Sequence, residues 1–597
     1  MHYLCPKFMT MTKRCIITIF LFYITALFLF SQNVEVSSNG QDNSIFYHTV
    51  EQGQTVYGIS IMYQVSEEDI YRLNPASREY IKVGEVLKIP QSETLNPSID
   101  NEIYIFHTIQ PQETIFSVSR KYNITPEQLT NTNPGLTPQT FAAGKNIRIP
   151  VARTQLPVTE KRTVIKEIDY TVKRRETMYS LTRNFNVSSE QLVKLNPVLR
   201  SGLKAGMVIK IPVETEETVV ITPNQSEFDF NTLIAYTNRF VKVDVVKIAL
   251  LLPFSVTRLS QARTEFYEGF LMAVEEMRNL GVSIELSLHD IGEGTQKTRE
   301  ILQNGQLVTS NILIGGETNE QIELIANYAL RNQIKYVVPF SSSCEKLTSN
   351  NAYMFQVNTS TQILYSYTTA WACSLFANYN IIFVNTNDQK DDKTPFVRAF
   401  KAELAQRYIS FRDINYNAAT FSTDISGYIS STKPNLIVPL SSSLEALNKI
   451  RGPLRTLLEA RSAPQITLFG YPEWQQYTND CLEDFYALNT YIYTSFFSNN
   501  LSRDIQQFHA NYRYRFNKNM LQSYPRYALL GYDTGMFFIS AIHTFGSNFE
   551  NNIQQVNYQS LQKGFRFERV NNWSGFFNTN LYMVNYKKDF SITRLER

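Results

Sequence analysis

The hydrophobic positions of this chain follow two patterns, one before and one after about residue 245. Before it, short segments in which apolar and polar residues alternate enclose segments with helical spacing, and this arrangement occurs three times. Alternation predicts strands, and a spacing of three to four predicts amphipathic helices. After it, continuous apolar runs of strand length alternate with longer helical patterns. The chain therefore divides into a repeated part and a larger part of another fold class.

The first repeat predicts the order strand, helix, helix, strand. The segments are 47–50, 56–63, 67–73 and 86–89. Thr55 can cap the first helix, and Ser66 followed by three acidic residues marks the start of the second. A unit of this size is marginal as an independent fold, so most of its apolar residues are expected in the core.

Constant spacing shows that the three copies are one module. In each copy a threonine precedes an asparagine by 25 residues, and a proline follows the asparagine after 16 or 17 more. The threonine–asparagine–proline sets are Thr49, Asn74 and Pro90; Thr108, Asn133 and Pro150; and Thr171, Asn196 and Pro212.

The three copies resemble lysin motif (LysM) domains, over 45–91, 104–151 and 168–213. The resemblance implies binding of N-acetylated glycan strands, as in peptidoglycan and chitin. It places the groove between the turn after the first strand and the loop after the second helix. The implied glycan-binding residues are Gln54, Thr55, Val56, Asn74, Pro75 and Ile81; Glu113, Thr114, Ile115, Asn133 and Pro134; and Glu176, Thr177, Met178, Asn196 and Pro197.

Structural roles compete with sugar contact at several of these positions. The asparagines can cap a helix end or a loop, and the threonines can cap the first helix, which we favour for them. The family's first turn usually reads Gly-Asp-Thr, and copy one alone keeps the glycine, Gly53. We therefore expect copy one to contribute most to binding.

The C-terminal part alternates strands with helices. The apolar run 246–252 is typical of a buried parallel strand. The predicted strands and helices that follow are 265–280, 284–289, 296–303, 311–314, 320–332, 336–339, 380–384, 435–439 and 465–469. This order predicts an α/β fold of doubly wound parallel sheets, and a length of about 350 residues predicts two lobes.

Residues 245–597 resemble type I periplasmic binding proteins, the family of the branched-chain amino-acid receptors. The resemblance is carried by the segments 248–254, 312–321, 334–343 and 527–542. It implies three crossings between the lobes, which we place near Asn358, Phe497 and Gly546. Lobe one would hold 245–358 and 498–546, and lobe two would hold 359–497 and 547–597.

The same resemblance implies a cleft lined by loops at the carboxyl ends of strands. The predicted cleft residues are Thr318, Ser341 and Ser342 from lobe one and Ser441 and Tyr471 from lobe two. Hydroxyl and backbone N–H groups there suit a carboxylate. The alternative is that the serines cap the helices that follow. No acidic partner for a ligand's ammonium group is identified, so the partner is either a small molecule or a cell-wall synthesis protein.

Residues 1–32 predict export from the cytoplasm. Lys13 and Arg14 precede the apolar run 15–30, which is either a signal peptide or a membrane anchor. The acidic segment 214–244 predicts a linker. With 57 basic and 54 acidic residues the net charge is +3, which argues against a nucleic-acid partner.

No catalytic or metal constellation is recognised. The six histidines are far apart, with no zinc-binding motif among them. Cys344, Cys373 and Cys481 are too few for a disulfide framework and are expected as buried free thiols. We expect a bacterial cell-envelope protein without enzyme activity, cofactor or metal. The alternatives are a wall-tethered receptor for amino-acid-like solutes and a regulatory scaffold of a wall synthase.

Overall fold

The computed structural model describes residues 45–220 and 241–597, apart from 52–53, 80, 92–93, 97–101, 138–139, 152–158, 186, 255–257, 359, 389–391 and 460–462. The predicted leader and most of the predicted linker 214–244 lie outside these residues. Within the described part of the chain, no helix combines the length and the apolar composition needed to span a membrane.

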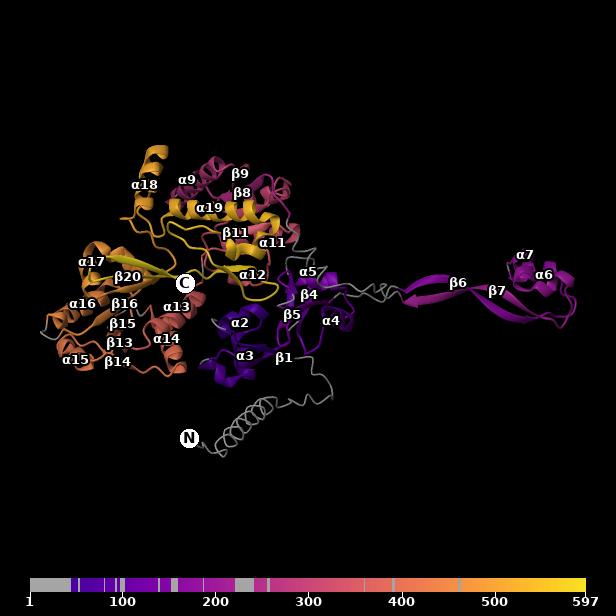
Figure 1. The fold of residues 1–597 in the computed structure, drawn as a ribbon, viewed down its shortest axis with the longest axis horizontal. Helices are drawn as coiled ribbons and strands as arrows, with labels where there is room; N and C mark the ends of the chain where they lie inside the picture. Colours follow the sequence, from indigo (N-terminus) through magenta and orange to yellow (C-terminus); the bar gives the residue numbers. More distant parts are fainter. Residues whose placement is uncertain are drawn as a thin grey trace, which may run out of the picture. The chain divides into compact units, whose positions relative to one another are not determined.

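Each LysM-like copy has the predicted order of elements (Figure 1). Copy one consists of β1 (Ile45–Thr49), α2 (Val56–Tyr63), α3 (Glu67–Leu73), a 3-10 turn η1 (Pro75–Arg78) and β2 (Val86–Pro90). Copy two consists of β4 (Glu102–Thr108), α4 (Ile115–Lys121), α5 (Pro126–Thr132) and β5 (Asn146–Val151), with β3 (Thr94–Asn96) added at the edge. Copy three consists of β6 (Thr159–Thr171), α6 (Met178–Phe185), α7 (Ser189–Leu195), η2 (Pro197–Ser201) and β7 (Val208–Val220).

The last strand of copy three extends into the segment that the sequence predicts as a linker. β6 and β7 pair antiparallel over 13 residues each, from Thr159↔Val220 to Thr171↔Val208. The register pairs residues of the segment before copy three with residues of the segment after it, as in Arg162↔Glu217. The predicted linker 214–244 therefore begins as a strand.

The C-terminal part contains two sheets, each of seven described strands. The first has the order β18-β19-β12-β11-β10-β8-β9. Its strands are β8 (Val246–Leu252), β9 (Ile284–Asp290), β10 (Ile312–Gly315), β11 (Lys335–Val338), β12 (Met354–Gln356), β18 (Phe567–Arg569) and β19 (Phe576–Asn578). The helices of this lobe are α9 (Arg258–Asn279), α10 (Thr295–Gln303), α11 (Asn319–Asn332), α12 (Glu345–Thr348), α18 (Arg503–Phe516), α19 (Tyr527–Phe545) and η4 (Gly546–Gln555).

The second sheet has the order β14-β13-β15-β16-β17-β20-β21. Its strands are β13 (Asn380–Asn385), β14 (Phe411–Asn415), β15 (Asn435–Pro439), β16 (Ile466–Gly470), β17 (Tyr491–Thr494), β20 (Tyr582–Tyr586) and β21 (Ile592–Glu596). Its helices are α13 (Thr361–Leu375), α14 (Thr394–Gln406), α15 (Phe421–Tyr428), α16 (Leu444–Leu458), η3 (Pro472–Tyr477) and α17 (Thr478–Ala487). Neighbours are parallel in both sheets except at β18–β19, β17–β20 and β20–β21. The prediction of two doubly wound, largely parallel sheets is confirmed.

The last crossing between the lobes differs from the prediction. It lies between Asn578 and Tyr582 and not near Gly546, because β18 and β19 belong to the first sheet. Aromatic packing explains their position: Phe576 stacks on Phe355 of β12, with ring centroids 4.6 Å apart. Gly546 instead ends α19 with φ 76°, a conformation that favours glycine.

Close packing between two helices holds lobe one together. Helices α9 and α19 lie side by side (Figure 1), and a Cβ at Gly531 would come within 1.9 Å of the Phe266 carbonyl oxygen. Such a close approach requires glycine.

Cys344 is buried and free, as are Cys373 and Cys481 in lobe two, which confirms the predicted thiols. Burial raises the pKa of Cys344 to about 12, so this thiol is a packing residue at neutral pH.

Candidate functional site

The first turn of each LysM-like copy is held by one repeated hydrogen-bond pattern. In copy one, His48 contacts the Tyr63 hydroxyl at 2.7 Å and Gln54 Oε1 at 2.8 Å, and Gln54 also accepts the Glu51 N–H. Burial lowers the pKa of His48, so its ring is neutral near pH 7. Gln54 therefore fixes the turn from inside, which is a structural role at a predicted glycan position.

Copies two and three repeat this pattern with other residues. His107 contacts Glu113, which accepts the Gln110 N–H, and Tyr170 donates to Glu176, which accepts the Lys173 N–H. The turn glycine is replaced by non-glycine residues with positive φ, Gln112 at 69° and Arg175 at 71°. That conformation costs an L-residue about 1–2 kcal/mol, and the surrounding hydrogen bonds offset it. Gly53 of copy one lies outside the described residues.

The predicted asparagines join the second helix to the last strand. Asn74 donates to the Ile70 and Lys88 carbonyls and accepts the Lys88 N–H. Asn133 does the same with Leu129 and Arg148, and Asn196 with Leu192 and Lys210. Both polar ends of each amide are therefore used within the module. The capping alternative holds, and a sugar contact by these side chains stays a prediction.

The predicted threonines cap the first helix of each copy. Thr55 Oγ1 accepts the Gly58 N–H, Thr114 accepts that of Ser117, and Thr177 accepts that of Ser180. Their hydroxyls are thus committed to the helix start, as favoured from the sequence.

A neighbouring aromatic position was missed in the sequence. Two residues after each capping threonine stands Tyr57, Phe116 or Tyr179. The exposed fraction is 40% for Phe116 and 73% for Tyr179, whereas Tyr57 is half-buried. An aromatic repeated beside the groove in every copy was the signal, and stacking on sugar faces is a usual role for such a side chain.

In copy one, parts of both C-terminal lobes cover the predicted groove. Tyr57 and Glu345 of α12 line one small cavity, and burial raises the pKa of Glu345 to about 7. Gln406, at the end of α14, donates to the Ile81 carbonyl at 3.0 Å. Since Thr55 and Ile81 stand at the two ends of the implied groove, copy one is no longer expected to be the main glycan site.

Copy two is bound to a loop of lobe one. The Gly135 N–H donates to the Asn572 carbonyl at 2.6 Å. The indole of Trp573, 2% exposed, packs against Phe106 with centroids 5.4 Å apart and against the Arg148 guanidinium at 5.0 Å. Burial lowers the pKa of Arg148 to about 9. Trp573 also contacts Tyr63 of copy one, so one side chain joins three parts of the chain.

Copy three keeps its predicted site open. For the residues of 167–212 whose side chains the structure describes, every hydrogen bond and ion pair stays within copy three. Thr177 and Pro197 are exposed, Met178 is half-buried, and Val198 is 51% exposed. With Tyr179 they form an accessible apolar and aromatic surface at the position that the resemblance implies.

The cleft residues of lobe one are only partly free. Thr318 caps α11 in a capping box with Gln321. Ser341 accepts the Ser343 N–H in a turn, and Ser342 is exposed. The alternative that these serines cap the next helix is wrong in lobe one. The residue before α12 is Cys344, and it makes no capping hydrogen bond with its side chain. Beside them the buried Arg263 forms a bidentate ion pair with Glu317 and lies 3.7 Å from the Phe340 ring centre.

The predicted cleft residues of lobe two form hydrogen bonds with other residues of the same lobe. Ser441 is 2% exposed and donates to Asp388, while the N–H and hydroxyl of Ser442 both contact Asp392. Tyr471 is fully buried and donates to the Pro439 carbonyl, so its predicted place at the cleft surface is wrong. Ser443 caps α16 by accepting the Ala446 N–H. The carboxylates of Asp388 and Asp392 thus accept the hydrogen bonds of Ser441 and Ser442 that were predicted for a ligand.

Comparison with known families decides the nature of the repeats. A family model described as LysM domain matches residues 48–90, 107–150 and 170–212. The chain carries three LysM domains. They are followed by the two-lobed domain of largely parallel sheets described above.

Curated relatives match parts of the chain. The amidase sle1 (N-acetylmuramoyl-L-alanine amidase) of Staphylococcus epidermidis is 22% identical over 170 residues, 28% of this chain and 50% of its own. AmiB of Haemophilus influenzae, named a probable N-acetylmuramoyl-L-alanine amidase, is 27% identical over 182 residues, 30% of this chain and 35% of its own. The chain thus spans half or less of these relatives, and the likeness to the amidases falls in the LysM region.

Solved structures match the C-terminal part. The leucine-binding protein LivK of Thermotoga maritima covers 59% of this chain and 97% of its own, at 16% identity and a TM-score of 0.32. LivJ of Streptococcus pneumoniae, in complex with isoleucine, covers 59% and 100%, at 15% identity and a TM-score of 0.34.

Proposed function

We propose that this chain is a non-enzymatic peptidoglycan-binding protein of the bacterial cell envelope, in which the third LysM domain is the principal glycan site. The accessibility of copy three carries the proposal: Tyr179 is 73% exposed beside the exposed Thr177. N-acetylated sugars need an apolar surface for the acetyl methyl together with backbone hydrogen bonds. The LysM relatives, two of them named for amidases of peptidoglycan, support this ligand and an extracytoplasmic location.

For the two-lobed domain we propose a protein partner, such as a cell-wall synthesis protein, over a free amino-acid-like solute. Ser441 and Ser442 donate to Asp388 and Asp392, and Lys393 pairs with Asp392 and Glu473. A zwitterionic ligand would have to displace these internal carboxylates. A role as a wall-tethered solute receptor is the alternative, and an amino-acid-induced rise in melting temperature would favour it.

The test uses the exported chain and purified sacculi. The protein should sediment with sacculi, and overnight incubation should release no soluble muropeptides. Failure to sediment at any salt concentration would exclude peptidoglycan binding. Release of muropeptides that one point mutation abolishes would exclude the non-enzymatic role.

A further inference from the structure

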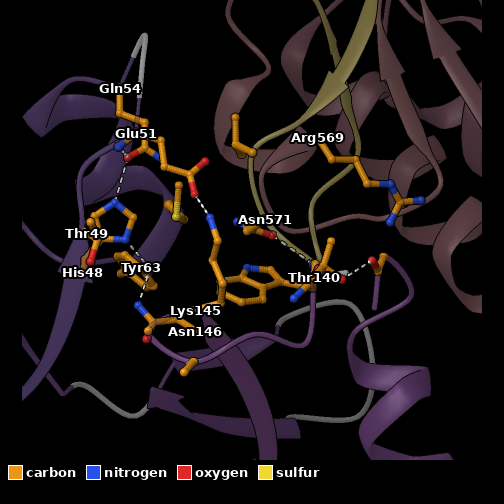
Figure 2. Close-up of a pocket in the computed structure, with 17 residues that line it drawn as sticks. His48, Thr49, Glu51, Gln54, Tyr63, Thr140, Lys145, Asn146, Arg569 and Asn571 are labelled. Atoms are coloured by element: carbon orange, nitrogen blue, oxygen red, sulfur yellow. Dashed lines mark hydrogen bonds and ion pairs between the residues drawn. The ribbon is translucent and has the colours of Figure 1, made fainter. Parts of the chain in front are cut away.

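A cavity of about 420 Å³ lies where two LysM domains meet the loop 569–573 of lobe one (Figure 2). Its wall includes His48, Thr49, Glu51 and Gln54 of copy one, and Thr140, Ala143, Gly144, Lys145 and Asn146 of copy two. Of the residues that the LysM resemblance implies for glycan contact, Gln54 alone lines it. Ligand pockets commonly measure about 300–1,000 Å³, so the volume suits a monosaccharide with a substituent. The cavity is therefore distinct from the groove of any single copy.

Three nitrogen donors of the lobe-one loop that lines this cavity have no hydrogen-bond acceptor. Among the described residues, Trp573 Nε1, Asn571 Nδ2 and Arg569 Nη1 are buried and donate to no partner. A buried donor left unpaired costs free energy, and three of them within five residues are unusual. Oxygen atoms of a ligand would complete all three.

The orientation of Asn571 is fixed by its own loop. Its Oδ1 accepts the N–H groups of Trp573 at 2.9 Å and Ser574 at 2.7 Å. A flipped amide would lose both bonds, so the network assigns the NH₂ group as the free end. Asn571 therefore offers a donor and not an acceptor.

The charged and aromatic residues of the wall further restrict the chemical class of the ligand. Figure 2 shows Lys145 of copy two reaching toward Glu51 of copy one, with which it forms an ion pair. The rings of Tyr63 and Trp573 also line the cavity, with centroids 6.2 Å apart. Because Glu51 already neutralises Lys145, the unpaired donors and the ring faces remain, and these suit a sugar that carries carbonyl or carboxylate oxygens.

We propose that this cavity binds an N-acetylated sugar bearing a carboxylate or peptide branch, with Trp573, Asn571 and Arg569 as donors to its oxygens. In peptidoglycan this chemistry occurs where the lactyl group joins the sugar to the stem peptide. The assignment of the source rests on the proposed peptidoglycan-binding function. The C-terminal domain would then take part directly in recognising the wall, in addition to the groove of copy three.

The experiment is isothermal titration of the exported chain with N-acetylmuramyl-L-alanyl-D-isoglutamine. Asn571→Asp keeps the pinned Oδ1 and replaces the free donor with an acceptor, so the affinity should fall at least tenfold. Trp573→Phe keeps a ring and removes the N–H, and it should also weaken binding. Asn500→Asp makes the same charge change at an exposed position and should bind like the wild type.

Three results would overturn the inference: no binding by the wild type at 5 mM ligand, unchanged affinity in both cavity variants, or equal affinity for lactate, which would leave no role for the sugar. Sedimentation of the wild type with sacculi is measured in parallel. Loss of sedimentation would refute the proposed function, whereas unchanged titrations with normal sedimentation would refute only the cavity site.

Discussion

Copies one and three of the LysM domain share their elements and their internal hydrogen bonds but not their surroundings. In both, a side chain of the first strand holds the turn residue, Gln54 or Glu176, and an asparagine ties the second helix to the last strand. Yet Tyr57 is half-buried and lines a cavity together with Glu345, whereas the equivalent Tyr179 is 73% exposed. The repeat determines the fold of each copy, and the neighbouring domain determines which copy is accessible.

The strongest expected effect is at Trp573, the residue that holds copies one and two against lobe one. Trp573→Ala should cost about 3–5 kcal/mol, because it removes a buried indole from contacts with Phe106, Tyr63 and Arg148. Hydrogen exchange should then accelerate in 46–150 and stay unchanged in 159–220. Trp573→Phe, which retains a ring, should show a smaller change. Equal protection in the wild type and the alanine variant would mean that the contact does not hold the domains together.

The second effect concerns pH and copy one alone. Burial raises the pKa of Glu345 to about 7 from its ordinary value near 4.5, against a smaller lowering by Tyr57. The folded state therefore binds more protons than the unfolded state between these values, so the stabilisation is present at low pH and is lost as pH rises through 7. The protection factor of the amides around Tyr57, which removes the pH dependence of the intrinsic exchange rate, should be higher at pH 5.5 than at pH 8. Glu345→Gln should abolish this difference, and a pH response that persists in the variant would assign it to another group.

The smallest effect concerns copy three alone. Arg175 has a φ of 71°, so Arg175→Gly should relieve strain and stabilise the copy by about 1 kcal/mol. Arg174→Gly is the matched control, since Arg174 is not among the positive-φ residues, and it should stabilise nothing. Slower local exchange in 170–212 is the readout. Destabilisation by Arg175→Gly would show that its side chain contributes more than its backbone costs.

The sequence predicted the LysM elements closely because caps and stops are local. The predicted helix 56–63 is α2, and Thr55, Thr114 and Thr177 are caps. Buried strands such as 435–439 were also correct, because a continuous apolar run marks them. The ribbon of β6 and β7 was missed, since its polar residues pair only across the two strands.

What the sequence could not provide was contact between distant segments. Nothing local indicates that Phe576 packs on Phe355 and so delays the last lobe crossing, or that Glu345 covers Tyr57. The same limit applies to Ser441 and Tyr471, whose internal partners Asp388 and Pro439 lie 53 and 32 residues away. Candidate sites read from motifs alone therefore overestimated the free surface in copy one and in lobe two.

The most direct measurement compares two alanine variants of the full exported chain in sedimentation with purified sacculi. Tyr179→Ala should weaken binding about tenfold, equivalent to about 1.4 kcal/mol, because it removes the exposed aromatic surface of the open copy. Tyr57→Ala should change it less than twofold, because that side chain is half-buried in a cavity that Glu345 also lines. The reverse order, with Tyr57→Ala the more damaging, would contradict the assignment of copy three as the principal glycan site.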